Sequence, residues 1–156
     1  MTDQSYVLWV ATGTYGLHMI EETVYNWHGW VRRVLKMPAE LSEFYLVNAV
    51  VGLLGISCSM IGWQSPALAL IFPAFMLVNA VLFHILPVIV TRQYSPGVFT
   101  AVILFLPVGI WCYVAAANNH VLNWQVGIVS AVAGFIIMMM PIVIQKTKNM
   151  PFFSQN

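Results

Sequence analysis

Long apolar runs, separated by short polar interruptions, make up most of this sequence. At about 1.5 Å of rise per residue, roughly 20 apolar residues cross about 30 Å of hydrocarbon, and the runs provide five such segments. Each is expected to be helical, because an open chain in lipid must satisfy its own backbone hydrogen bonds. The pattern predicts helices at residues 5–30, 39–63, 66–91, 97–117 and 124–145.

The composition agrees with an integral membrane protein. Hydrophobic residues make up 60% of the chain and charged residues 7%, whereas soluble domains have about 25% charged residues. The five runs use almost the whole chain, so we expect residues 1–156 to form a single all-α transmembrane bundle. A formal charge of +1 without a basic tract gives no reason to expect nucleic acid as a partner. The pattern leaves the oligomeric state open.

The distribution of basic residues predicts the orientation. All of them follow the first, third or fifth predicted helix, so five crossings place them on one side of the membrane. Basic residues concentrate on the cytoplasmic side. We therefore predict a multi-pass protein of the cytoplasmic membrane with its N-terminus outside and its C-terminus inside. The basic residues are Arg32, Arg33, Lys36, Arg92, Lys146 and Lys148.

The first predicted helix contains the string H-M-I-E-E at residues 18–22. A charged side chain at bilayer depth costs about 2.5–3.5 kcal/mol on insertion scales, and such residues usually have a partner and a function. His18, Glu21 and Glu22 are three and four residues apart, so they project from one stripe of a helix. Counted from the cytoplasmic end, Glu22 lies about 12 Å deep and His18 about 18 Å.

Polar residues of the next two helices reach the same depths. The same count puts Asn48 and His84 at about 11–13 Å and Asn79 at about 18 Å, while Glu43 lies nearer the cytoplasmic mouth. Such agreement is not expected of scattered structural polar groups. We predict that Asn48, Asn79 and Glu43 line a cavity shared with the first helix.

Structural roles are open alternatives for several of these groups. An intramembrane His–Glu pair can be a hydrogen bond between helices, worth about 0.6–2 kcal/mol, and Asn48 and Asn79 can join helices in the same way. Glu43 can be a helix-start charge, favourable at the positive end of a helix dipole. Asn79 and His84 are about 140° apart on an ideal helix, so they line one site only if it is wide or if Pro87 distorts the helix.

A polar connection, Q-Y-S-P-G at residues 93–97, precedes the fourth predicted helix. Successive Pro and Gly predict a cytoplasmic turn that starts this helix. Two interpretations of Tyr94 are open. It closes over the mouth of the cavity, or it is an interfacial aromatic residue of a simple turn.

Three of these features together resemble the HXXEE family of small integral membrane proteins. They are the string at residues 18–22, a second intramembrane histidine at His84, and Y-S-P-G at residues 94–97. The family has no known function and is suspected to be enzymatic, so the resemblance implies site residues but no substrate. The implied site residues are His18, Glu21, Glu22, His84 and Tyr94.

The leading functional hypothesis is a metal-dependent enzyme. Two imidazoles and two or three carboxylates suit Zn²⁺ with an open position, or an iron or manganese centre. We predict His18, Glu22 and His84 as ligands, and Glu21 as a general base or as a group that orients a ligand. Glu43 is a further ligand if two metals bind. An activated water would attack an ester, amide or phosphate of a lipid from the inner leaflet, whereas iron would favour oxidation of an apolar chain.

Two hypotheses without a metal stay open. A glutamate in a hydrophobic cavity, Glu22, can act as a general acid in isomerisation or cyclisation of an apolar lipid. For an enzyme of either kind, the predicted catalytic residues are Glu21, Glu22 and Tyr94. Alternatively, His18 and Glu22 form a proton relay in a proton-coupled carrier. Five helices are few for a transporter, and no polar stripe continues to the outer face, so the carrier ranks last.

Overall fold

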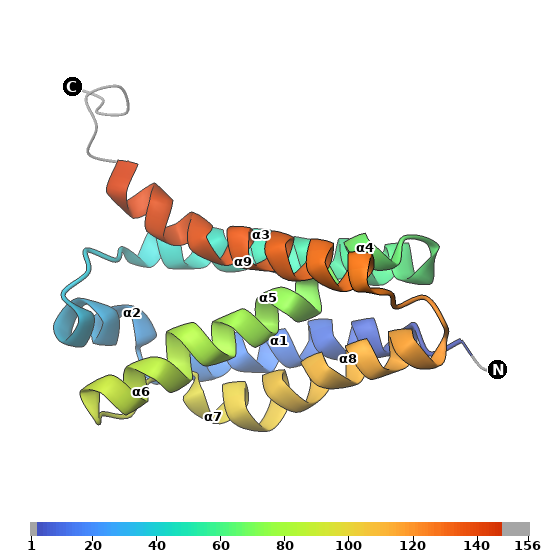
Figure 1. Ribbon diagram of the computed structural model, residues 1–156. Helices are drawn as coiled ribbons and strands as arrows, with labels where there is room; N and C mark the ends of the chain where they lie inside the picture. The colour runs from blue at the N-terminus through green and yellow to red at the C-terminus, as the bar shows by residue number, and fades with distance from the viewer. Residues whose placement is uncertain (1–2, 148–156) are drawn as a thin grey trace.

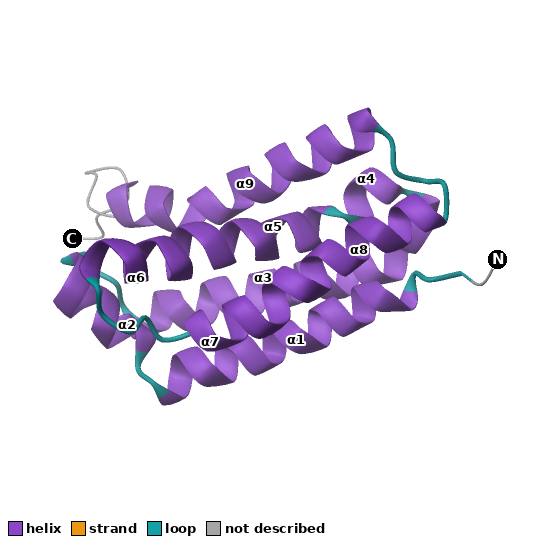
Figure 2. Ribbon diagram, turned by 60° about the horizontal axis from the view of Figure 1, so that its bottom comes forward, coloured by secondary structure: helices purple, strands orange, loops and turns teal. Residues whose placement is uncertain are grey.

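The computed structural model describes residues 3–147, with side chains to residue 143, and every regular element in this part is helical. Long helices lie side by side and run back and forth between the two ends of a bundle (Figure 1; Figure 2). The elements are α1 (Tyr6–Val24), α2 (Trp27–Trp30), η1 (Val31–Leu35), α3 (Leu41–Ile61), η2 (Gly62–Gln64), α4 (Pro66–Ala69), α5 (Ile71–Asn79), η3 (Ala80–Ile85), α6 (Leu86–Thr91), α7 (Val98–Thr100), η4 (Ala101–Phe105), α8 (Leu106–Asn118) and α9 (Trp124–Thr147).

Four helical stretches are long and apolar enough to cross a membrane, where the sequence pattern predicts five. They are Leu41–Gln64, Pro66–Thr91, Val98–Asn118 and Trp124–Val143. The predicted count is therefore wrong for the described part of the chain. The helix α1 is not among them, because its two glutamates and its histidine lower its mean hydropathy.

The first helix is also shorter than the predicted range of 5–30. It ends at Val24, and Asn26 then adopts a left-handed conformation with φ of 54°. Asparagine tolerates this region because its short polar side chain bonds locally; its Oδ1 accepts a hydrogen bond from the Gly29 amide at 3.2 Å. This bend turns the chain into α2 and the π-helix η1.

Two further π-helical segments lie directly before prolines. η3 precedes Pro87 and η4 precedes Pro107. A proline lacks an N–H and its ring clashes with the carbonyl four residues earlier, and a wider π turn relieves both problems. The two segments pack against each other and carry His84 and Phe105, whose side chains are buried.

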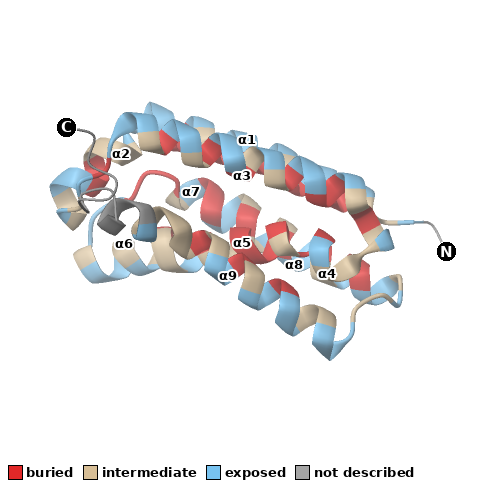
Figure 3. Ribbon diagram, turned by 90° about the horizontal axis from the view of Figure 1, so that it is seen from above, coloured by how far each residue is buried: buried red, intermediate tan, exposed pale blue. Residues whose placement is uncertain are grey.

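Aromatic side chains form a layer in the core beside α1. Tyr15 stacks on Phe105 with ring centroids 6.1 Å apart, and Phe72 and Phe75 meet its ring edge-on at 5.6 and 6.2 Å. Buried positions follow the inward faces of the helices, while the outer faces are exposed (Figure 3). Those outer faces are rich in large apolar side chains, as expected of an integral membrane protein.

Candidate functional site

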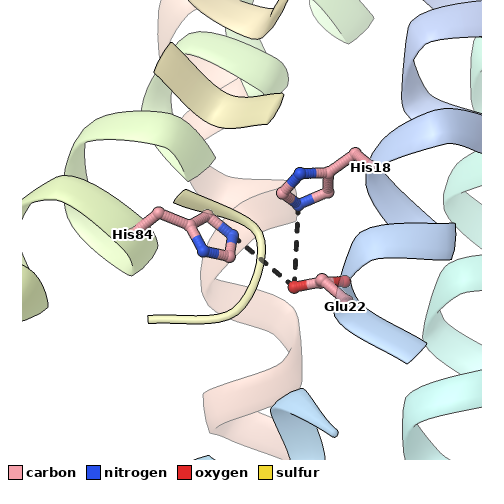
Figure 4. Close-up of side chains that lie close together, drawn as sticks. All are labelled: His18, Glu22 and His84. Carbon is pink, nitrogen blue, oxygen red and sulfur yellow. Dashed lines mark ion pairs between the residues drawn. The ribbon is translucent and has the colours of Figure 1, made fainter. Parts of the chain in front are cut away.

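Three buried side chains converge inside the bundle, two from α1 and one from η3 (Figure 4). Glu22 Oε1 lies 3.6 Å from His18 Nε2 and 3.5 Å from His84 Nε2. The two imidazoles meet edge to face with centroids 4.7 Å apart, and both residues are fully buried. The structure thus brings together the three residues predicted as metal ligands, which we call the triad.

The two Nε2 atoms of the triad lie near Glu22 but have no hydrogen-bond partner in the described part of the chain. Distances of 3.5 and 3.6 Å exceed the usual hydrogen-bond range, and within the described chain neither Nε2 atom has another hydrogen-bond partner. An unpaired buried polar group costs about 1–3 kcal/mol, so something is expected to bind there.

The spacing of the triad suits a metal ion. Tetrahedral zinc, with ligands at about 2.0–2.1 Å, separates its ligand atoms by about 3.4 Å, close to both distances from Glu22. All three ligand atoms lie within 4.8 Å of one another.

The first glutamate of the motif, Glu21, has a different set of partners, at the start of the helix that begins at Val98. Glu21 Oε1 accepts hydrogen bonds from the Tyr94 hydroxyl at 2.7 Å and from the amides of Gly97 and Phe99 at 3.0 and 3.2 Å. Its Oε2 accepts from Thr100, through the amide at 2.7 Å and the hydroxyl at 2.5 Å. Five donors thus saturate this carboxylate and attach the connection before α7 to α1.

Thr100 connects Glu21 to the triad. Its hydroxyl oxygen lies 2.8 Å from His18 Nδ1, 2.5 Å from Glu21 Oε2 and 3.2 Å from the Gly97 carbonyl. The Glu21 carboxylate oxygen and the Gly97 carbonyl oxygen can only accept, so the Thr100 hydroxyl donates its one proton to one of them. Toward His18 the hydroxyl oxygen is then the acceptor, and His18 Nδ1–H is the donor. This hydrogen-bond pattern places a proton on His18 Nδ1 and leaves Nε2 as the nitrogen that faces Glu22. Metal-binding histidines are commonly held by such a partner.

Gly97 allows the connection to cross both imidazoles. Its φ is 92°, a region that favours glycine. A Cβ atom here would lie 2.5 Å from His84 Cε1 and 2.8 Å from His18 Cε1. The glycine of Y-S-P-G is therefore needed for both its conformation and its small size.

A family model described as "Protein of unknown function with HXXEE motif" matches residues 9–112, about two thirds of the chain. The chain belongs to the HXXEE family. No curated protein and no solved structure matches it. The matched region contains the triad, Glu21 and the Y-S-P-G connection.

In this HXXEE protein, Glu22 also lines a pocket of about 80 Å³ between α3, α5 and α9. A buried water needs about 10–15 Å³ on this measure, so the pocket holds several waters or part of an alkyl chain. Asn48, Asn79 and Glu43 line it too, as the sequence predicts. Its apolar walls include Val47, Val51, Phe75, Phe83, Ile137 and Met138.

The polar pocket residues differ in their own partners. Asn48 accepts from the Tyr15 hydroxyl at 2.5 Å and donates to the Phe44 carbonyl at 2.8 Å. Glu43 forms a capping box with Glu40 at the start of α3, so it is a helix-start charge as well as a pocket residue. Asn48 and Glu43 therefore each make a structural contact and also line the pocket.

Tyr94 is not among the described residues that line the pocket. It is half exposed, its ring meets Tyr25 edge-on at 5.8 Å, and its hydroxyl donates to Glu21. Partial burial and the adjacent Glu21 carboxylate raise the pKa of the Tyr94 phenol, so Tyr94 keeps its proton and acts as a donor.

Sequence reasoning missed two residues of the cluster. Thr100 follows Gly97 by three residues, and this Gly-x-x-Thr spacing at a helix start was the available signal. Tyr15 lies one turn before His18 on the stripe that carries the triad residues of α1. Its ring is 6.4 Å from that of His18, and its hydroxyl fixes Asn48.

Proposed function

We propose that this HXXEE protein is a metal-dependent membrane enzyme whose divalent cation is held by His18, Glu22 and His84. The observation that supports this most directly is the convergence of three buried ligand atoms, with neither Nε2 paired elsewhere. Two histidines, one glutamate and an open position are a donor set of catalytic zinc, and also of iron centres that bind oxygen. A cation also compensates the buried charge of Glu22.

The chain's own residues have distinct parts in this proposal. Glu21 and Thr100 orient His18, and Gly97 lets the connection cover both imidazoles. Glu22 belongs to the triad and also lines the pocket, so a substrate in the pocket would reach the metal site. When bound, a zinc ion supplies a water acidic enough to ionise near neutral pH, which suits hydrolysis or transfer of a lipid ester or amide.

The pocket supports an apolar substrate that enters sideways. Its walls come from α3 on one side and α9 on the other, and both helices are apolar enough to cross a membrane. A lipid-derived chain passing between them would reach Glu22 without crossing water. A membrane lipid or another apolar molecule is accordingly the proposed substrate class.

We also propose that α1 crosses the membrane with its N-terminus outside. It lies alongside the longer helices (Figure 2), and its buried polar side chains face the bundle. The connections after α1 and after α6 carry Arg32, Arg33, Lys36 and Arg92, and they lie at the same end as the C-terminal end of α9 (Figure 1). Lys148, the last basic residue of the orientation argument, lies outside the described residues.

This orientation places the triad in the cytoplasmic half of the membrane. Basic residues favour the cytoplasmic side, and Glu22 lies in the last turn of α1, near the basic end. A reporter that is active only in the cytoplasm, fused to the C-terminus, is expected to be active. An inactive C-terminal fusion together with an active N-terminal one would contradict the orientation.

Metal analysis of the detergent-purified protein tests the proposed function. We expect about one equivalent of zinc, iron or manganese per chain in the unchanged protein and in a His28→Ala control, which alters a histidine outside the triad. His84→Ala and Glu22→Gln should lose the metal. Zinc supports hydrolysis or transfer, and iron supports oxidation of an apolar chain.

Two results would count against a metal enzyme. One is metal content near zero in all variants, even after growth and purification with each metal supplied. The other is an activity that survives chelators and is lost in Glu22→Gln, which would favour the metal-free acid. Comparing extracted lipids from cells with and without the gene provides the substrate for that assay.

A further inference from the structure

The side chain of Asn79, at the end of α5, has one atom without a partner. Asn79 is 8% exposed and lines the pocket that Glu22 also lines. Its Nδ2 donates to Met138 Sδ at 3.5 Å, while its Oδ1 has no hydrogen-bond partner among the residues that the structure describes.

Met138 fixes the direction of this amide. A thioether sulfur accepts hydrogen bonds and cannot donate them, so the NH₂ group of Asn79 must be the end that faces Met138. The unpaired end is therefore an acceptor. A buried acceptor without a donor is unfavourable, and a ligand that donates a hydrogen bond would remove that penalty.

The other uncharged polar groups of the pocket are largely used. The Tyr15 hydroxyl gives its proton to Asn48, and the Asn48 amide donates to the Phe44 carbonyl. Trp27 contributes a buried indole N–H without a described partner. Besides the carboxylates, the pocket thus offers one acceptor and one donor, and a hydroxyl or an amide can satisfy both.

We propose that the pocket takes an uncharged amphiphile: an apolar chain bearing a hydroxyl or amide N–H that donates to Asn79 Oδ1. This inference rests on the proposed function, since it names the substrate class of that site. Among the described pocket-lining residues none is Lys, Arg or His, so no side chain there pairs with an anionic head group. Three glutamates line the pocket, Glu22, Glu40 and Glu43, and they further disfavour an anionic head group. A neutral hydroxyl or amide supplies the donor that Asn79 Oδ1 requires and places no further positive charge beside the proposed cation.

The test compares two probes whose oxygen carries either a hydrogen or a methyl group. Hexadecan-1-ol donates a hydrogen bond and its methyl ether does not, while their chains are the same. Affinity is obtained for the full-length, detergent-purified protein from the rise in unfolding temperature with probe concentration. We expect the alcohol to bind about tenfold or more tightly than the ether.

Two variants connect that preference to Asn79. Asn79→Leu removes the acceptor and should bring the alcohol-to-ether affinity ratio close to one. Met138→Leu leaves Asn79 in place but lets its amide rotate, so the ratio should fall by several-fold. Met139→Leu, a neighbouring substitution outside the described pocket lining, should leave the ratio unchanged.

Equal binding of both probes by the unchanged protein, or an unaltered ratio in both Asn79→Leu and Met138→Leu, would overturn the inference. If Asn79→Leu does not fold, the milder Met138→Leu variant decides. The measurement is made with and without added zinc, so the two proposals fail separately. Alcohol preference without metal uptake refutes only the metal enzyme, and metal uptake without alcohol preference refutes only the substrate class.

Discussion

Replacing Thr100 with valine removes the hydroxyl that connects Glu21 to His18 and keeps the branched shape of the side chain. Two hydrogen bonds are lost, the one donated to Glu21 Oε2 at 2.5 Å and the one accepted from His18 Nδ1 at 2.8 Å. The Thr100 backbone amide still donates to Glu21. The change therefore disturbs the orientation of His18 without detaching the connection from α1.

The expected magnitudes follow from these contacts. A hydrogen bond to a charged group contributes about 1.5–3 kcal/mol, so the free energy of unfolding should fall by about that amount. Partners that orient a metal-binding histidine typically change metal affinity by about 10–100-fold when mutated. We expect zinc affinity to weaken within this range in Thr100→Val, because His18 Nε2 is no longer held as the free acceptor.

The assay has two parts, one of which needs no metal. Nitrogen-15 NMR of labelled histidine in the metal-free protein should show His18 with a proton on Nδ1, and a mixture of tautomers in Thr100→Val. Competition with a chromogenic chelator then measures zinc affinity. Thr100→Ser should restore both signals. Thr91→Val, which removes a hydroxyl bonded to the Pro87 carbonyl, is the matched control.

One outcome would refute the reasoning directly. If His18 carries its proton on Nε2 in the unchanged protein, the hydroxyl of Thr100 is not an acceptor and the assigned chain of hydrogen bonds is wrong. Unchanged zinc affinity in Thr100→Val, with a clear change in tautomer, would show that orientation of His18 does not limit binding.

Three further substitutions test other parts of the cluster. Gly97→Ala should lower the free energy of unfolding by at least about 2 kcal/mol, because of its positive φ and the imidazoles next to it; Gly52→Ala, where a Cβ meets nothing within 4 Å, is the control for thermal unfolding. Tyr94→Phe should cost about 1 kcal/mol and leave zinc affinity within about threefold, since four donors to the same carboxylate remain; a larger loss of affinity would assign the phenol a direct role. Glu22→Gln should reduce zinc affinity by at least about tenfold in the chelator assay, and an unchanged affinity would remove this carboxylate from the ligand set.

Much of the cluster followed from spacing and depth alone. The i, i+4 spacing placed His18 and Glu22 on one stripe, and the depth count brought His84 to the same level. Asn48, Asn79 and Glu43 were predicted to line the cavity for the same reason, and they do. Side-chain periodicity is a local property, so it survives in the folded structure wherever the helix is regular.

Other features depended on contacts that no local pattern encodes. The different role of Glu21 is set by donors at Tyr94, Gly97 and Thr100, which reach it only after the bundle has formed. The π-helix η3 begins directly after Asn79 and contains His84, so the ideal-helix angle between these two residues does not apply. The end of α1 was not predicted because no proline marks it near Asn26. The two acids of α1 lower its mean hydropathy below that of the other long helices, which its length alone does not indicate.

The saturation of Glu21 has a consequence for how the chain is made. The groups that bond this carboxylate follow it by 73 to 79 residues, so they do not yet exist when α1 leaves the ribosome. If α1 crosses the membrane as proposed, this segment of modest hydropathy with two acids is expected to remain beside the insertion machinery until the later helices arrive. Chains that stop before residue 94 are expected to leave α1 unstably inserted and to be degraded rapidly, even though every residue of the H-M-I-E-E string is present.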